Sequence, residues 1–137
     1  MKIINIILFV FLTLSITRAK VSHEVEDKVY TARITYYTND IKWGNKVACQ
    51  TSKIATEGTT VAAHPDFKLG TKVFIPDLKG TLDDGVFVVQ DRGTAVTKKK
   101  ASNGRAYVFD VYVKNDEKLN RFARTKPEYM KIFVLKP

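Results

Sequence analysis

Two aspartates in strand-like runs have the surroundings that acid/base chemistry requires. Asp91 ends the apolar run VFVVQ and is followed by Arg92 and Gly93. A carboxylate at the end of a strand, beside a glycine that lets a ligand approach, is a common way to present an acid at the mouth of a β-barrel. An aspartate that only caps the turn at Gly93 shows the same pattern. The residues alone leave both interpretations open.

Asp110 lies in the middle of the run YVFDVYV, where an unpaired charge is costly to bury. It either faces solvent on an alternating strand or lies in a partly desolvated cleft beside Val108 and Tyr112. In the second case burial raises its pKa and keeps it protonated, which a general acid requires. His64, in VAAHPD, precedes a proline turn. Its spacing from the aspartates is not fixed by the sequence.

Other catalytic and metal chemistry has little support in the composition. The chain has one cysteine and two histidines, so an internal disulfide is excluded and a zinc site is poorly supported. Cys49 is expected to be a small buried apolar residue rather than a nucleophile. We therefore predict no metal and no cofactor.

Short strands separated by turns must position the candidate residues. The sequence predicts strands in VYTARITYYT, TKVFI, VFVVQ, YVFDVYV and YMKIFVLK. A short helix is predicted from the N-cap Asn115 to Lys126-Pro127. Long surface loops are expected over 40–60 and 92–106. Five strands and one short helix are typical of a mainly β fold, a small β-barrel with a crossover helix.

The start of the chain has the features of a leader. A charged Lys2, an apolar run from Ile3 to Ile16 and the small residue Ala19 are typical of a secretory signal peptide over residues 1–19. The apolar run is shorter than the ~20 residues that span a bilayer. We expect cleavage near Ala19 and a location outside the cytoplasmic membrane, either secreted or periplasmic in the cell envelope.

The remaining chain is long enough for one domain. We expect a polar lead-in over 20–28 and a barrel domain over 29–137. The formal charge is +9 for the whole chain and 9 − 2 = +7 when Lys2 and Arg18 are lost with the leader. Such a charge draws an exported protein toward polyanions, although scattered lysines are equally typical of a solvated surface. Export disfavours nucleic acid. We therefore expect no nucleic-acid partner, a membrane contact only through the leader, and a monomer.

Taken together, the segments VAAHPDFKLGTKVFIP, VVQDRGTAV and YVFDVYV resemble the three-aspartate domain of bacterial cell-wall enzymes. That domain is shared by MltA-type lytic transglycosylases and stationary-phase survival proteins. The resemblance runs from about Tyr30 to the C-terminus. It implies a six-stranded double-psi β-barrel that cleaves the β-1,4 bond between N-acetylmuramic acid and N-acetylglucosamine without water, leaving a 1,6-anhydro end. Asp110 matches the family's acid/base aspartate, and Asp91 matches the neighbour that orients the sugar or holds the acid's proton.

This chain departs from the family pattern at one position. His64 stands where the pattern has its first aspartate. Rare lipoprotein A, a related double-psi barrel lytic transglycosylase, is similar to this chain there, with a histidine before its Gly-Thr and an Asp-Arg-Gly segment later. The resemblance therefore implies a catalytic set of Asp110, Asp91 and His64.

The expected partner is the glycan strand of peptidoglycan. We predict substrate contacts from Tyr36, Tyr37, Thr94 and Lys98, and Trp43 is a further candidate for sugar stacking. At least one of the two tyrosines is expected in the core instead. Two alternatives to a cleaving enzyme stay open. One is a non-catalytic module of the expansin or barwin type that grips wall glycans with the same barrel. The other is a secreted inhibitor or adhesin that uses the basic residues.

Overall fold

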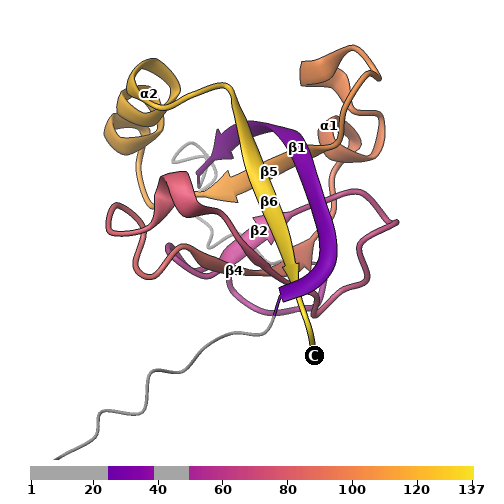
Figure 1. Cartoon of the computed structure of the whole chain (residues 1–137). Coiled ribbons are helices and arrows are strands. Elements are labelled where there is room, and N and C mark those ends of the chain that lie inside the picture. The colour runs from indigo at the N-terminus through magenta and orange to yellow at the C-terminus, as the bar shows by residue number, and fades with distance from the viewer. Residues whose placement is uncertain (1–24, 39–49) are drawn as a thin grey trace, which may run out of the picture.

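The chain forms a closed six-stranded β-barrel (Figure 1). The computed structural model describes residues 25–38 and 50–137. The strands are β1 (Val25–Tyr37), β2 (Thr60–Ala62), β3 (Lys72–Phe74), β4 (Val86–Asp91), β5 (Val108–Tyr112) and β6 (Tyr129–Leu135). The predicted mainly β barrel is thereby confirmed. The predicted leader, Trp43 and Cys49 lie outside the described residues.

Parallel and antiparallel pairs interleave in the barrel, whose strand order is β1-β5-β2-β4-β3-β6. β1 pairs in parallel with β5, and β2 pairs in parallel with β4. The two parallel pairs are joined by the antiparallel pairing of β2 with β5. This interleaved order is consistent with the double-psi barrel that the resemblance implies. It also places β2 between the two strands that carry Asp91 and Asp110.

Apolar side chains fill the barrel. Successive residues of a strand point to opposite faces of a sheet, and the inward set is buried. Its members include Ile34, Val61, Val73, Phe87, Phe109 and Ile132. Complete burial of one such side chain stabilises the fold by about 1.5–3 kcal/mol. Because side chains occupy the interior, a ligand has to bind on the outer face or at an end.

α2 (Asp116–Thr125) is the helix that the sequence predicts. The side chain of Asn115 caps it by accepting a hydrogen bond from the backbone N–H of Lys118 at 2.9 Å. Phe122 is its buried residue and attaches the helix to the barrel. No helix in the described part of the chain is long and apolar enough to cross a membrane.

The prediction of a single helix is wrong, because a second helix lies within the surface loop expected over 92–106. α1 (Thr94–Thr97) is one turn long, and the 3-10 turn η3 (Lys100–Ser102) follows it. Val96 is the buried residue of α1. A four-residue helix with one apolar side chain has no periodic pattern that a sequence window can detect. A further 3-10 turn, η2 (Pro76–Leu78), follows β3.

Candidate active site

Asp110 and Asp91 lie in one row of residues that crosses four strands. Thr35 of β1 pairs with Asp110 of β5. Ala62 of β2 pairs with Asp110 on one side and with Asp91 of β4 on the other. Paired residues point to the same face of a sheet, and neighbouring strands lie about 4.8 Å apart. The two carboxylates therefore flank Ala62 on the outer face of the barrel.

A β-bulge directs Asp91 to that face. Val61 pairs with Val89, but the next residue, Ala62, pairs with Asp91 rather than with Gln90. A bulge places two residues of one strand opposite one residue of its partner and re-aims the side chain that follows. With regular alternation Asp91 would share the inward orientation of Val89. The bulge therefore places the two aspartates on the same face, one on each side of Ala62.

The surroundings of Asp110 are partly desolvated. Val108 and Tyr112, its neighbours on the same face of β5, are both buried. Val108 packs with Ala62 and Val96, while Tyr112 packs in a separate small cluster. Asp110 itself is half-buried between them. Of the two environments that the sequence allows for Asp110, open solvent and partial desolvation, the structure shows partial desolvation.

Burial controls the protonation of Asp110. It raises the pKa of this carboxyl from 3.8 to about 6, and the nearby charge of Asp91 adds to the rise. Thr35 opposes it, because its hydroxyl donates a hydrogen bond of 2.8 Å to Oδ1 of Asp110 and so favours the charged form. A carboxyl with a pKa near 6 can both give and accept a proton close to neutral pH.

Asp91 is a hydrogen-bonded carboxylate. Its Oδ1 accepts from the backbone N–H of Arg92 at 2.9 Å and of Gln50 at 3.0 Å. Its Oδ2 accepts from the hydroxyl of Tyr37 at 3.2 Å. These donors differ from the amides of the following glycine turn, which an aspartate acting only as a turn cap would bind. Asp91 instead connects β4 to β1 and to Gln50, which lies before β2 in the chain.

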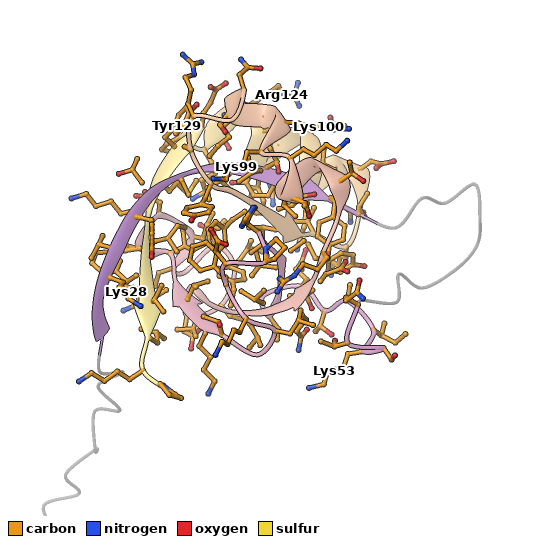
Figure 2. The ribbon with its side chains drawn as sticks, turned by 90° about the vertical axis from the view of Figure 1, so that its right-hand side faces the viewer. Lys28, Lys53, Lys99, Lys100, Arg124 and Tyr129 are labelled. Atoms are coloured by element: carbon orange, nitrogen blue, oxygen red, sulfur yellow. The ribbon has the colours of Figure 1, made fainter. Side chains whose placement is uncertain are left out.

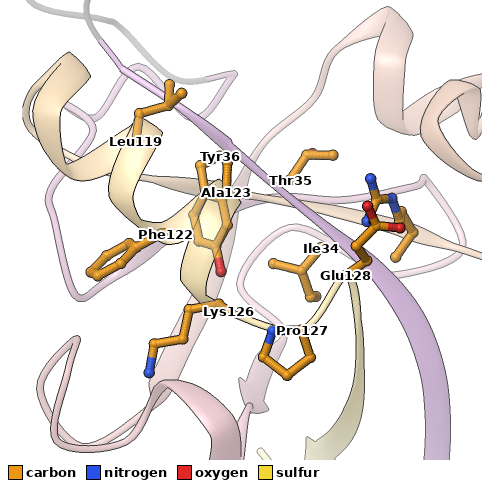
Figure 3. Close-up of a pocket in the computed structure, with 10 residues that line it drawn as sticks. Ile34, Thr35, Tyr36, Leu119, Phe122, Ala123, Lys126, Pro127 and Glu128 are labelled. Atoms are coloured by element: carbon orange, nitrogen blue, oxygen red, sulfur yellow. The ribbon is translucent and has the colours of Figure 1, made fainter.

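The two adjacent tyrosines face opposite sides of β1. Tyr37 lies beside the aspartates, with its hydroxyl on Asp91 and its ring edge-on to Tyr112 at a centroid distance of 5.4 Å. Tyr36 is partly buried against the core cluster and packs on Phe122 at a centroid distance of 5.5 Å, in a pocket between β1 and α2 (Figure 3). The structure therefore brings Tyr37, but not Tyr36, to the candidate site.

The hydroxyl of Tyr36 is buried and has no hydrogen-bond partner among the described residues. Burial, with a smaller contribution from the charge of Asp77, raises the pKa of Tyr36 to about 12. Tyr36 is thus the core tyrosine that the sequence anticipates for one member of the pair. A sugar contact by Tyr36 stays a prediction that this placement does not favour.

His64 lies just beyond the end of β2, but its contacts belong to a different group. Its Nδ1 accepts a hydrogen bond from the backbone N–H of Asp66 at 3.2 Å and lies 3.3 Å from Oδ2 of that residue. The His64 ring lies 5.5 Å from the ring of Tyr107, whose hydroxyl donates to Asp66.

Arg92 fixes the turn that carries His64. Its guanidinium donates to the backbone carbonyl oxygen of Ala63 at 3.1 Å and to that of Phe67 at 2.6 Å. Asp91 and Arg92, although adjacent in the chain, thus make separate contacts. Asp91 lies in the row of site residues, and Arg92 holds the turn that carries His64. A catalytic role of His64 stays a prediction.

Thr94 and Lys98, two of the predicted substrate contacts, are both exposed on or directly after α1. Val96 lies between them and packs against Ala62 and Val108. This contact places α1 at the border of the row that contains the two aspartates.

Thr35 and Ala62 are site residues that the motifs do not indicate. Thr35 is 75 positions away from Asp110 in the chain, so only the register of β1 against β5 reveals the contact. The described residues contain no group of three or more histidines, cysteines, aspartates or glutamates that could hold a metal ion.

Comparison with known proteins adds no family assignment. No family model matches this chain, and no curated protein matches it. A function for this protein therefore has to be inferred from the surroundings of Asp110 and from the resemblance of the sequence motifs.

Proposed function

We propose that the protein is an exported lytic transglycosylase that cleaves the glycan strands of peptidoglycan, with Asp110 as its acid/base. The observation that carries this proposal is the half-buried carboxyl of Asp110 beside the carboxylate of Asp91, with a pKa raised to about 6. Glycosidases commonly use two carboxylates whose environments set different protonation states. The resemblance of the three motif segments supports peptidoglycan as the substrate.

In the proposed reaction Asp110 makes both proton transfers. Its protonated carboxyl gives a proton to the glycosidic oxygen, and the bond from that oxygen to C1 of N-acetylmuramic acid breaks. The resulting carboxylate accepts the proton of the 6-hydroxyl of the same sugar, whose oxygen bonds to C1 and closes the 1,6-anhydro ring. Asp110 ends the cycle protonated, as it began, and no water is consumed.

The neighbours of Asp110 have supporting roles in this scheme. Thr35 holds Oδ1 in place, which leaves Oδ2 to carry the transferred proton. The negative charge of Asp91 favours the protonated form of Asp110 and stabilises positive charge that develops on the sugar ring as the bond breaks. Tyr37 is a positioning residue, because its hydroxyl binds Asp91.

The cleavage proposal is tested by incubating purified cell wall with wild-type protein and with Asp110→Asn. Asp116→Asn is a matched control, because Asp116 is an exposed acid in the first turn of α2. We expect wild type and the control to release products with 1,6-anhydro ends, detected by mass spectrometry, and Asp110→Asn to bind wall without releasing them. Wild-type protein that binds wall but releases no anhydro product would instead favour the non-catalytic glycan-binding module.

The location outside the cytoplasmic membrane is a separate part of the proposal. It depends on the leader-like residues 1–19. N-terminal sequencing of exported protein should give a start near Lys20. Recovery of exported protein that still begins with Met1 would contradict cleavage of a leader.

A further inference from the structure

The segment between the two aspartates is strongly basic. Residues 92–109 include five arginines and lysines and no acidic residue. Four of them lie after α1, between its C-cap and the turn that follows η3, and we call these four the basic platform: Lys98, Lys99, Lys100 and Arg105. None of the salt bridges between described residues involves them.

The backbone of the basic platform is held by its own hydrogen bonds. Ser102 is fully buried, and its hydroxyl bonds to the carbonyl oxygen of Lys99 at 3.0 Å and to the backbone of Ala106. The N–H of Gly104 donates to the same Lys99 oxygen at 3.1 Å. A fixed backbone loses less conformational entropy when its side chains bind a ligand. The platform is therefore a structured surface.

The basic platform lies next to the candidate active site. Val96, in the same segment, packs against Ala62 and Val108, which flank Asp110 in the row and along β5. Lys98, Lys100 and Arg105 are exposed, while Lys99 lies over the ring of Tyr107 at 4.2 Å. Figure 2 shows Lys99 and Lys100 on this segment. Lys99 also lies near enough to Asp66 for its charge to help lower the pKa of that carboxyl, so the charge available to a ligand is mainly that of Lys98, Lys100 and Arg105. Positive charge at the border of a site favours an anionic group of the ligand there.

We infer that the basic platform binds carboxylates of the peptide stems on the glycan strand, so that the protein prefers stem-bearing strands to stripped ones. This inference rests on the proposed function and adds the form of the substrate. Removal of a stem by an amidase frees the lactyl carboxylate of the muramic acid, close to the sugar chain, whereas an attached stem carries its carboxylates farther from the sugar chain. Long, exposed lysines at the border of the row of site residues match such outlying charges better than they match the neutral sugar rings.

The test compares two double variants that lose the same charge. Lys98→Gln/Lys100→Gln changes the basic platform, and Lys79→Gln/Lys131→Gln changes two exposed lysines after η2 and on β6. Both are made in the Asp110→Asn protein, so that binding is measured without cleavage. The ligands are soluble glycan strands free of other wall polymers, before and after an amidase removes their stems. Affinities are measured by calorimetry at low ionic strength.

We expect the parent protein to bind stem-bearing strands several-fold more tightly than stripped strands. The platform variant should reduce this preference about three- to tenfold, the effect of two exposed charge pairs, and the control variant should retain it. Equal affinity of the parent for both strands, or an unchanged preference in the platform variant, overturns the inference. Strands that retain phosphate-rich wall polymers form a third arm, and a preference that follows the polymer rather than the stems also overturns it.

The outcomes separate this inference from the proposed function. If binding depends on stems but wild-type protein releases no anhydro product, the inference about the basic platform is supported and the proposed enzymatic function is contradicted. If wild-type protein releases anhydro product but the parent protein binds the two strands with equal affinity, the proposed function is supported and the inference about the basic platform is contradicted.

Discussion

Replacing Asp110 by asparagine should make the protein more stable near neutral pH. The native state holds the proton of Asp110 more tightly than the unfolded chain does, because burial raises its pKa from 3.8 to about 6. The contribution of Asp110 to the unfolding free energy is therefore greatest below pH 3.8, and it falls as the pH rises through about 6. Asp110→Asn keeps the shape of the side chain and its contact with Thr35 but removes the titration.

The size of the effect follows from the shift. One pKa unit corresponds to 1.36 kcal/mol, so the rise from 3.8 to about 6 corresponds to about 3 kcal/mol between acidic and neutral pH. For a domain of this size, about 1 kcal/mol changes the melting temperature by roughly 4 °C or more. The gain of the variant over wild type is therefore large enough to measure by either chemical or thermal unfolding.

The assay is urea unfolding of wild type and Asp110→Asn at several pH values from 4 to 7.5. All other ionisable groups are common to the two proteins, so the difference between their unfolding free energies isolates Asp110. We expect the variant to gain up to about 3 kcal/mol relative to wild type across this range. A difference that is constant with pH, or that falls as the pH rises, would refute a buried carboxyl with a raised pKa.

Three further substitutions test the site and its neighbours. Thr35→Val removes the hydrogen bond that favours the charged form of Asp110, so the pH optimum of wall cleavage should move upward, by about half a unit to one unit; an optimum that stays in place or moves down contradicts this role. Asp91→Asn removes a charge that raises the pKa of Asp110, so the optimum should move downward and the rate should fall; an upward move would be inconsistent with that coupling. Tyr36→Phe deletes a buried hydroxyl that has no hydrogen-bond partner among the described residues, so thermal unfolding should show unchanged stability or a gain of up to about 1 kcal/mol. A clear loss of stability would show that the hydroxyl is hydrogen-bonded.

The strands with alternating residues and the capped helix could be predicted from the sequence, since those signals are local. β2 could not, because its three residues are all buried and too few to show a period. The sequence predicts a loop over 40–60 and no strand directly after it, so β2, the strand that separates the two aspartates, was not predicted. The sixth strand of the expected barrel came from the family resemblance rather than from a pattern.

The candidate site could be predicted only in part. Asp91 and Asp110 stand out because they interrupt apolar, strand-like runs. Their placement on one face, on either side of Ala62, depends on a bulge at Gln90 and on long-range register. The contact with Thr35 has the same origin. His64 entered through local motif similarity, and its contacts in the fold depend on the turn that Arg92 holds.

The most direct test of the central claim is cleavage of purified peptidoglycan in water labelled with heavy oxygen, by wild type and by Asp110→Asn. If Asp110 transfers the proton of the 6-hydroxyl, the wild-type products end in unlabelled 1,6-anhydro rings, and the variant releases none. Label in the new sugar ends would show hydrolysis by water, and anhydro release by Asp110→Asn at the wild-type rate would show that another residue is the acid/base. Either result would contradict the account.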